Sequence, residues 1–272
     1  MAYCIGWDET KTKRTFSDGT IKEGTFYKNT PWLIEGKVTY SNGTITEGTF
    51  DGKTPWLIEG KVTYSDGEVH EGRFSRLTGN LIEGKVILAD GEVLEGMFDK
   101  CVGGIIEGKK TYPDGHIEIE EGAFDKDTGE LIEGKKTTSI GIIQEGIFNK
   151  DTGNLIEGKS YFPQLFFYEG RFEDNQLIEG KATYPDGLFE EGTFDKDTPF
   201  CLIKGKKTYP DGQIEEGIFD THRQRLIEGK ATYPDGLIEE GTFDEYTEIL
   251  IEGKVTYSDG TIEFVNDYAE AA

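Results

Sequence analysis

The side chains best suited to acid–base or metal chemistry in this sequence are three histidines. His70, His116 and His222 stand at unrelated positions, far apart along the 272 residues. A zinc site or a catalytic site needs such groups to converge on one point. No nucleophile stands in a recognisable strand–turn–helix motif, and no glycine-rich loop precedes a predicted helix. The sequence therefore predicts a protein that is not an enzyme and has no catalytic, cofactor-binding or metal-binding residues.

Three acidic loops give the strongest competing signal for a bound ion. Residues 125–129 have the sequence Asp-Lys-Asp-Thr-Gly, residues 149–153 Asn-Lys-Asp-Thr-Gly, and residues 195–198 Asp-Lys-Asp-Thr. This spacing resembles the start of a calcium loop, although the glycine comes one place early. An Asx turn, in which the first side chain accepts backbone N–H groups, explains the pattern better. A calcium-responsive tether is therefore kept as the alternative function.

The segments that carry these residues recur about every 24 residues. The motif Leu/Ile-Ile-x-Gly-Lys starts at residues 33, 57, 81, 105, 131, 155, 177, 202, 226 and 250. The motif Glu-Gly-x-Phe alternates with it, about 12 residues away. A half-unit of this length fits one strand and one turn. Asp-Gly and Asn-Gly pairs, as in Tyr-Pro-Asp-Gly at residues 233–236, favour tight hairpin turns between the strands.

The predicted fold is all-β. We expect a single elongated, twisted antiparallel β-meander built from tandem hairpin repeats. Residues 1–14 depart from the repeat and are predicted to form an N-terminal cap. About ten hairpin repeats follow over residues 15–263. Residues 264–272 are predicted to form a C-terminal cap or tail.

Strand pairing around the turn at residues 234–236 predicts what each face of the sheet carries. Gly229 should face Gly241 on the same face as the aromatic residues, where Ile227 should face Phe243. Glycine weakens a strand unless something needs the space. We expect the rings of neighbouring Tyr and Phe residues to occupy it. On the other face Lys230 should form a cross-strand ion pair with the facing glutamate, rather than bind a ligand.

The formal net charge of −24 limits the classes of partner. Such a chain repels nucleic acid phosphates, and it makes contact with anionic membranes improbable. It favours a protein partner, which would be basic, or self-association. Cys4, Cys101 and Cys201 are odd in number and are predicted to be free thiols in a reducing compartment. With neither a signal peptide nor an apolar span in the sequence, we expect a cytoplasmic protein, with export by a signal-independent route left open.

The repeats resemble those of the MORN family. Residues 168–172, Tyr-Glu-Gly-Arg-Phe, are similar to the Tyr-x-Gly-x-aromatic opening of a MORN repeat, and residues 226–236 are similar to its second half. The resemblance covers roughly residues 14–263, but most units carry a polar residue where the family has its first tyrosine. It implies a β-hairpin array that serves as a scaffold, a tether or a protein-docking rod. Because some MORN proteins are linked to membranes through phospholipids, a membrane-associated tether belongs to the alternative function.

One unit breaks the repeat at residues 160–168, Ser-Tyr-Phe-Pro-Gln-Leu-Phe-Phe-Tyr, where the Asp-Gly turn is lost and aromatic residues are gained. An aromatic cluster of this kind is typical of a contact surface, although a bend that packs on itself is equally consistent with the pattern. Thr-Pro-aromatic sequences in three long loops add rings that would dock a partner or fold back onto the sheet. The predicted partner-binding residues are Trp32, Trp56, Tyr161, Phe162, Leu165, Phe166, Phe167, Tyr168 and Phe200. The predicted function is a non-enzymatic scaffold for protein–protein interaction or assembly.

Overall fold

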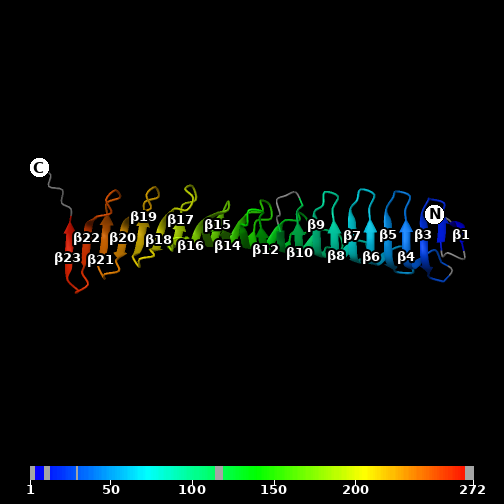
Figure 1. Ribbon diagram of the computed structural model, residues 1–272, viewed down its shortest axis with the longest axis horizontal. Coiled ribbons are helices and arrows are strands. Elements are labelled where there is room, and N and C mark those ends of the chain that lie inside the picture. Colours follow the sequence, from blue (N-terminus) through cyan, green and yellow to red (C-terminus); the bar gives the residue numbers. More distant parts are fainter. Residues whose placement is uncertain (1–3, 9–12, 29, 114–118, 267–272) are drawn as a thin grey trace. The chain divides into compact units, whose positions relative to one another are not determined.

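The computed structural model describes residues 4–8, 13–28, 30–113 and 119–266, and for residues 4–8 the backbone alone. Every regular element in these ranges is a β-strand, and successive strands within each part of the chain pair antiparallel (Figure 1). The predicted fold class, an all-β antiparallel meander of tandem hairpins, is confirmed. No helix in the described ranges has the length and hydropathy needed to span a membrane.

The chain divides into two compact units. Unit 1 comprises Met1–Ser139 with Lys150–Gly153, and unit 2 comprises Ile140–Asn149 with Asn154–Ala272. The strands of unit 1 are β1 (Cys4–Asp8), β2 (Lys13–Phe16), β3 (Ile21–Phe26), β4 (Leu33–Thr39), β5 (Ile45–Phe50), β6 (Leu57–Thr63), β7 (Val69–Phe74), β8 (Leu81–Ile87), β9 (Val93–Phe98), β10 (Ile105–Thr111), β11 (Ile119–Phe124) and β12 (Leu131–Thr137). The strands of unit 2 are β13 (Ile143–Phe148), β14 (Leu155–Phe162), β15 (Phe166–Glu173), β16 (Gln176–Thr183), β17 (Phe189–Phe194), β18 (Leu202–Thr208), β19 (Ile214–Phe219), β20 (Leu226–Thr232), β21 (Ile238–Phe243), β22 (Leu250–Thr256) and β23 (Ile262–Asn266).

The two predicted caps are described only in part. At the N-terminal end β1 pairs with β2, and at the C-terminal end β22 pairs with β23. Residues 1–3, 9–12 and 267–272 lie outside the described residues. The capping role of both segments stays a prediction.

Tight turns join the strands as the Asp-Gly pairs predict. In the turn between β20 and β21, the N–H of Gly236 donates to the Tyr233 carbonyl at 2.9 Å. Gly236 has a φ of 89°, a left-handed conformation that glycine adopts without a Cβ penalty. The Asp235 carboxylate accepts the N–H of Leu237 at 3.0 Å. Three residues therefore reverse the chain and fix the register of the hairpin.

The repeat glycines face one another as predicted, but for a different physical reason. Gly229 pairs with Gly217 on one side and with Gly241 on the other. A Cβ on Gly229 would lie 2.2 Å from the carbonyl oxygen of Glu216, and φ is 147°. The expectation that aromatic rings occupy this space is wrong, because the backbone of the adjacent strand fills it. Glycine is needed there for the close approach of two strands.

A β-bulge beside each long connection decides which side chains enter the core. Phe219 pairs with Leu226, and Ile227 is left in the bulge. Leu226 is 4% exposed, whereas Ile227 is only half-buried. The β20–β21 ladder runs from Glu228–Thr242 to Thr232–Ile238, so a direct pair of Ile227 with Phe243 stays a prediction. On its other side Phe243 pairs with Leu250. The extra residue turns the leucine of each repeat, and not the isoleucine, toward the phenylalanine.

The core of each unit is thus a stripe of phenylalanine and leucine on one face of the sheet. Its buried phenylalanines are Phe16, Phe50, Phe74, Phe98, Phe124, Phe148, Phe172, Phe194, Phe219 and Phe243. Its buried leucines are Leu33, Leu57, Leu81, Leu131, Leu155, Leu177, Leu202, Leu226 and Leu250, with Ile105 in the equivalent place. The long connections fold back over this face, as where Lys110 donates to the carbonyl of Gly129 and Lys207 to that of Gln224. They supply a partial second layer.

Beside this stripe runs a row of directly paired residues, one from each strand from β2 onward, which we call the central row. In unit 1 it comprises Arg14, Lys22, Val38, Thr46, Val62, His70, Val86, Leu94, Lys110, Glu120 and Lys136. In unit 2 it comprises Gln144, Ser160, Tyr168, Ala182, Glu190, Lys207, Glu215, Ala231, Glu239, Val255 and Glu263. Among the rows of the sheet, this one varies most between repeats.

Candidate protein-binding site

Four aromatic side chains of unit 2 form a cluster on the covered face of the sheet. Phe162 ends β14, Phe166 begins β15, Tyr168 lies two residues further along β15, and Phe200 lies in the long connection between β17 and β18. The ring of Phe166 lies 4.6 Å from that of Phe162 and 5.1 Å from that of Phe200. Tyr168 stacks on Phe166 at 4.8 Å and on Phe200 at 5.6 Å. We call these four residues the aromatic cluster.

Phe200 has the most unusual environment of the four. Its φ is 68°, a left-handed conformation that is an outlier for a bulky residue and that Gln224 and Glu248 adopt at the same position of their repeats. Its side chain is 52% exposed although it stacks on two rings. A hollow of about 50 Å³ lies beside it, with Pro199 and Leu177 in its lining. The backbone thus holds a large ring at the surface, beside a small apolar recess.

Three buried polar atoms in or near the cluster lack a hydrogen-bond partner among the described residues. They are the Ser160 hydroxyl, the Tyr168 hydroxyl and the side-chain carbonyl of Gln176. Ser160 pairs directly with Tyr168, and Gln176 lines the hollow beside Phe200. Burial raises the pKa of the Tyr168 hydroxyl, so this group stays protonated at neutral pH. Nearly all buried polar groups in proteins are hydrogen-bonded, so unpaired ones are unusual. Core packing alone does not explain why polar residues stand at these positions.

The structure separates the other predicted partner-binding residues from this cluster. Tyr161 and Phe167 pair with each other on the opposite face of the sheet. Leu165 lies in the turn before β15 and is exposed. Trp32 and Trp56 belong to unit 1, where Lys22 lies 5.3 Å from the Trp32 ring and Trp56 packs against Gly79. The structure therefore brings four of the nine predicted residues together, and whether any of the nine binds a partner stays a prediction.

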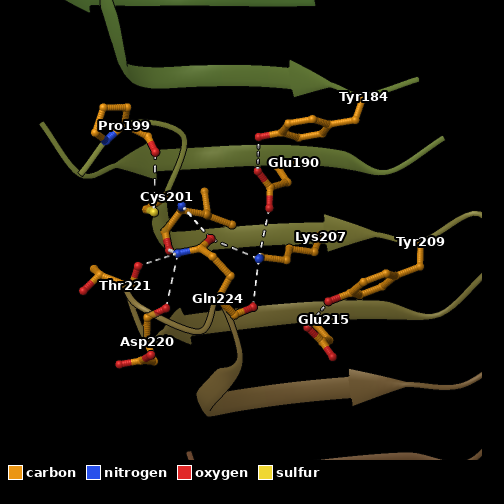
Figure 2. Close-up of polar contacts among 11 residues, drawn as sticks. Tyr184, Glu190, Pro199, Cys201, Lys207, Tyr209, Glu215, Asp220, Thr221 and Gln224 are labelled. Atoms are coloured by element: carbon orange, nitrogen blue, oxygen red, sulfur yellow. Dashed lines mark hydrogen bonds and ion pairs between the residues drawn. The ribbon is translucent and has the colours of Figure 1, made fainter. Parts of the chain in front are cut away.

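A buried ion pair that the sequence analysis missed lies in the same unit. The ammonium of Lys207 is 3.0 Å from the Glu190 carboxylate, and both side chains are 3% exposed. Lys207 also donates to the backbone carbonyl of Gln224 at 2.9 Å and lies 4.9 Å from the centre of the Phe219 ring. Figure 2 shows that the Tyr184 hydroxyl reaches the same carboxylate, at 2.8 Å. The charges are thus surrounded by hydrogen bonds and by one aromatic face.

A sequence signal for this pair exists. Most repeats place valine or alanine after the lysine of the Gly-Lys motif, whereas Lys110, Lys136 and Lys207 stand there in three repeats. Strand alternation places this position on the face opposite the preceding lysine, which is the covered face. A charged residue there needs a buried partner. The signal is visible once the aligned repeats are compared at that one position.

The titratable groups of this region do not form a reactive centre. Burial raises the pKa of the Cys201 thiol, which therefore stays protonated at neutral pH. Burial also raises the pKa of the Glu215 carboxyl, although Tyr209 donates to it at 2.8 Å. Cys101 and Cys201 are free within the described part of the chain. The side chain of Cys4 lies outside the described residues.

The acidic loop at residues 125–129 has the hydrogen bonds of a local turn. The carboxylate of Asp125 accepts the N–H groups of Asp127 and Thr128 at 3.0 and 2.9 Å, which is an Asx turn. In the described ranges no three His, Cys, Asp or Glu side chains gather as metal ligands. His70 contacts Glu68, His222 is exposed, and His116 lies outside the described residues.

Comparison with known proteins yields structures of low similarity only. No protein-family model matches the chain, and no curated protein matches it. The TCP10 domain of Danio rerio CPAP, solved with a peptide of Danio rerio STIL, is 16% identical over 94% of this chain and 93% of that chain, with a TM-score of 0.23. The TCP domain of Drosophila melanogaster SAS-4 (dCPAP), solved with a proline-rich motif of Ana2 (dSTIL), is 12% identical over 89% of this chain and 96% of that chain, with a TM-score of 0.22. At these values the likeness carries no inference about function.

Proposed function

We propose that this chain is a non-enzymatic scaffold of MORN-like hairpin repeats that binds a protein partner through the aromatic cluster of unit 2. The observation that carries the proposal is Phe200, a half-exposed ring held in a left-handed backbone conformation and stacked on Phe166 and Tyr168. Large rings that are already ordered lose little side-chain entropy on binding, which is why aromatic residues dominate interface energetics. The small recess beside Phe200 offers room for an apolar anchor from the partner.

The partner that best fits this surface is a basic protein segment with an apolar anchor. The chain carries a net charge of −24, and Asp195 and Asp197 stand in the connection that bears Phe200. Opposite charge on the partner would increase the association rate and fix its orientation. Two copies of this chain would repel each other, so self-association is the less favoured occupant of the cluster.

The test compares Phe200→Ser with Phe167→Ser in the full chain. Phe167 is the matched control, because it lies one residue from Phe166 but on the opposite face. The partner is captured from native extract, purified, and its Kd is measured for each variant. We expect Phe200→Ser to weaken binding about 30-fold, as for an interface hot spot, and Phe167→Ser to leave Kd unchanged. Both melting temperatures should stay within a few degrees of the wild type.

Three results would contradict the proposal. Equal affinity of wild type and Phe200→Ser would remove the aromatic cluster from the interface. A large fall in melting temperature with unchanged affinity would mean that Phe200 is a core residue. Light scattering that shows a dimer of the wild type, lost in Phe200→Ser, would assign the surface to a second copy of the chain rather than to another protein.

A further inference from the structure

Two successive repeats of unit 2 build a similar frame around the central-row residue. In one repeat Lys207 fills it, between the Glu190 carboxylate, the Gln224 carbonyl and the Phe219 ring. The long connection that supplies Gln224 holds this residue at a φ of 58°. This arrangement shows which chemical group the frame accepts. The group is a primary ammonium on an alkyl stem, with a carboxylate, a carbonyl and an aromatic face around it.

The next repeat has the same frame without the lysine. Register places Ala231 opposite Glu215, just as Lys207 stands opposite Glu190. The equivalent of Gln224 is Glu248, which also has a left-handed φ, of 63°. Phe243 and Tyr209 take the places of Phe219 and Tyr184. Tyr209 donates to Glu215 at 2.8 Å, the same distance as from Tyr184 to Glu190.

A cleft of about 560 Å³ marks the place where the lysine is missing. Its lining includes Tyr209, Glu215, Gln224, Ala231, Phe243 and Glu248. Ala231 is 2% exposed and forms the base of the cleft. The volume is large enough for a whole lysine side chain with solvent around it. Glu215, Phe243 and the connection at Glu248 all contribute to its walls, so a carboxylate, an aromatic ring and the connection are present as in the preceding repeat. There the side chain of Gln224 adds a further hydrogen bond to Lys207.

The other charged groups of the cleft do not already fill this role. Arg225 pairs with the Glu248 carboxylate at 2.5 Å and donates to the Tyr246 carbonyl. Arg223 lies over the Tyr246 ring at 4.4 Å. Among the described residues no cation lies within 4 Å of the Glu215 carboxylate, whose hydrogen bonds come from Tyr209 and Gln213. Burial raises the pKa of Glu215, although the hydrogen bond from Tyr209 and the charge of the neighbouring Lys207 act in the opposite direction.

We propose that the cleft above Ala231 binds a primary ammonium group on an alkyl chain, which is the chemistry of a lysine side chain or a free alkylamine. Glu215 provides the counter-charge, the carbonyl of Glu248 accepts a second hydrogen bond, and the Phe243 ring faces the cation. This binding site is separate from the aromatic cluster, so the inference stands or falls independently of the proposed function.

In the first test, a small ligand is titrated into the full chain and its binding is monitored by NMR chemical shifts. The probe is Nα-acetyl-lysine methylamide, and the control ligand is the norleucine analogue, which has the same stem without the charge. We expect the lysine probe to bind, the norleucine analogue not to bind, and Glu215→Gln to weaken binding about tenfold. Glu263→Gln is the matched control, because Glu263 accepts the same bond from Tyr257 at 2.8 Å but does not line the cleft. Butylammonium separates the two sources: affinity equal to that of the lysine probe assigns the cleft to free amines, and weaker affinity assigns it to lysine within a protein.

The second test fills the cleft from within the chain. Ala231→Lys should place an ammonium at Glu215, keep the fold, and reduce probe binding below detection. Lys207→Ala should create a second vacant frame, and butylammonium should then restore part of the melting temperature that this variant loses. Wild-type affinity of Ala231→Lys for the probe would overturn the proposal. So would equal binding of the lysine and norleucine probes, an outcome that needs no variant to fold.

Discussion

The central row alternates valine with Thr46 and His70 in one stretch of unit 1 and is charged in one stretch of unit 2, although the strands that carry it have nearly the same sequence. In unit 1 Val38, Val62 and Val86 are all buried against the phenylalanine–leucine stripe. In unit 2 Glu190, Lys207 and Glu215 follow one another on adjacent strands. The glycine pairs, the bulges and the Phe–Leu stripe are common to both stretches.

This difference shows how a repeat protein separates its fold from its recognition chemistry. The glycines and the bulge fix the backbone, so one position per strand is left to vary on the covered face. Valine at this position closes the face with hydrocarbon. Lysine or glutamate there creates a buried polar network, and alanine opens a cleft within such a network. The same frame therefore serves as core beside the valines of unit 1, as an ion-pair site at Glu120 and Lys136 of that unit, and as a candidate binding surface in unit 2.

The largest effect should come from the glycines, and it should be the same in both stretches. A Cβ would lie 2.1 Å from a backbone oxygen at Gly60 and 2.2 Å at Gly229, and both residues have φ near 147°. Gly60→Ala and Gly229→Ala should each lower the free energy of unfolding by about 3 kcal/mol, from backbone strain and overpacking together. Urea unfolding measures this change. Tryptophan fluorescence reports unit 1 alone, because Trp7, Trp32 and Trp56 all belong to it.

Gly67→Ala is the control for backbone strain alone. Gly67 has a φ of 96°, but no atom lies within 4 Å of the position of its missing Cβ. We expect a loss of about 1 kcal/mol. Equal losses at Gly60 and Gly67 would show that close strand approach is not the reason for the repeated glycine.

The central row should distinguish the two stretches. Lys207→Ala leaves the Glu190 carboxylate buried without a counter-ion and should cost about 3 kcal/mol. Val38→Ala removes two methyl groups from a buried site and should cost about 2 kcal/mol. Replacement of both charged partners, in Lys207→Met with Glu190→Leu, should recover most of the loss. A double variant as unstable as Lys207→Ala would mean that the lysine acts through packing and not through its charge.

Much of the fold follows from the sequence, because it depends on local signals that repeat. Tyr-Pro-Asp-Gly at residues 233–236 predicts the tight turn, and the alternation of motifs predicts the register from Gly229–Gly241 to Lys230–Glu240. The alternation of apolar and polar residues could not predict the bulge at Ile227. One inserted residue moves its neighbour to the other face of the sheet, and no particular residue type in the sequence signals this insertion. For the same reason the sequence analysis placed isoleucine where leucine lies.

The candidate sites were predictable only in part, because they depend on contacts between repeats. The break at residues 160–168 pointed to Phe162, Phe166 and Tyr168, and the structure brings Phe200 onto them from another repeat. The cleft above Ala231 gives no motif at all. Alanine there is an ordinary small residue until Lys207 is seen to fill the same frame one repeat earlier.

The pH dependence of stability should reveal the buried carboxylate of Glu215. Burial raises the folded-state pKa of Glu215 above the ordinary value of 4.5, so the folded chain binds this proton more tightly than the unfolded chain. The free energy of unfolding therefore falls as pH rises through the window between the two pKa values. Glu215→Gln removes this fall, and the variant should gain stability relative to wild type as pH rises above 4.5. The effect should be smaller than that of Lys207→Ala, because Tyr209 and Gln213 still hydrogen-bond the side chain.

Asp244→Asn provides a control with the opposite sign. The hydroxyl and the backbone N–H of Thr247 donate to the Asp244 carboxylate and lower its pKa. Its contribution to stability is therefore present above the unfolded pKa and is lost as pH falls through the folded pKa. Melting temperatures at several pH values measure both variants. Parallel pH profiles of the two variants would contradict the assignment of Glu215 as a carboxylate destabilised by burial.

The smallest effect should come from the ion pairs on the open face, which are alike in both units. Lys37 lies 3.0 Å from Glu47, and Lys254 lies 3.1 Å from Glu240, with side chains 40–51% exposed. The Lys207–Glu190 pair has the same separation but is buried. Because water screens an exposed pair, Lys37→Gln and Lys254→Gln should each cost about 0.5 kcal/mol, and this cost should vanish in 1 M salt. The cost of Lys207→Ala should persist in that salt, since a buried charge is screened far less. Urea unfolding at low and high salt separates the two cases, and a salt-sensitive loss at Lys207 would show that solvent reaches the covered face of unit 2.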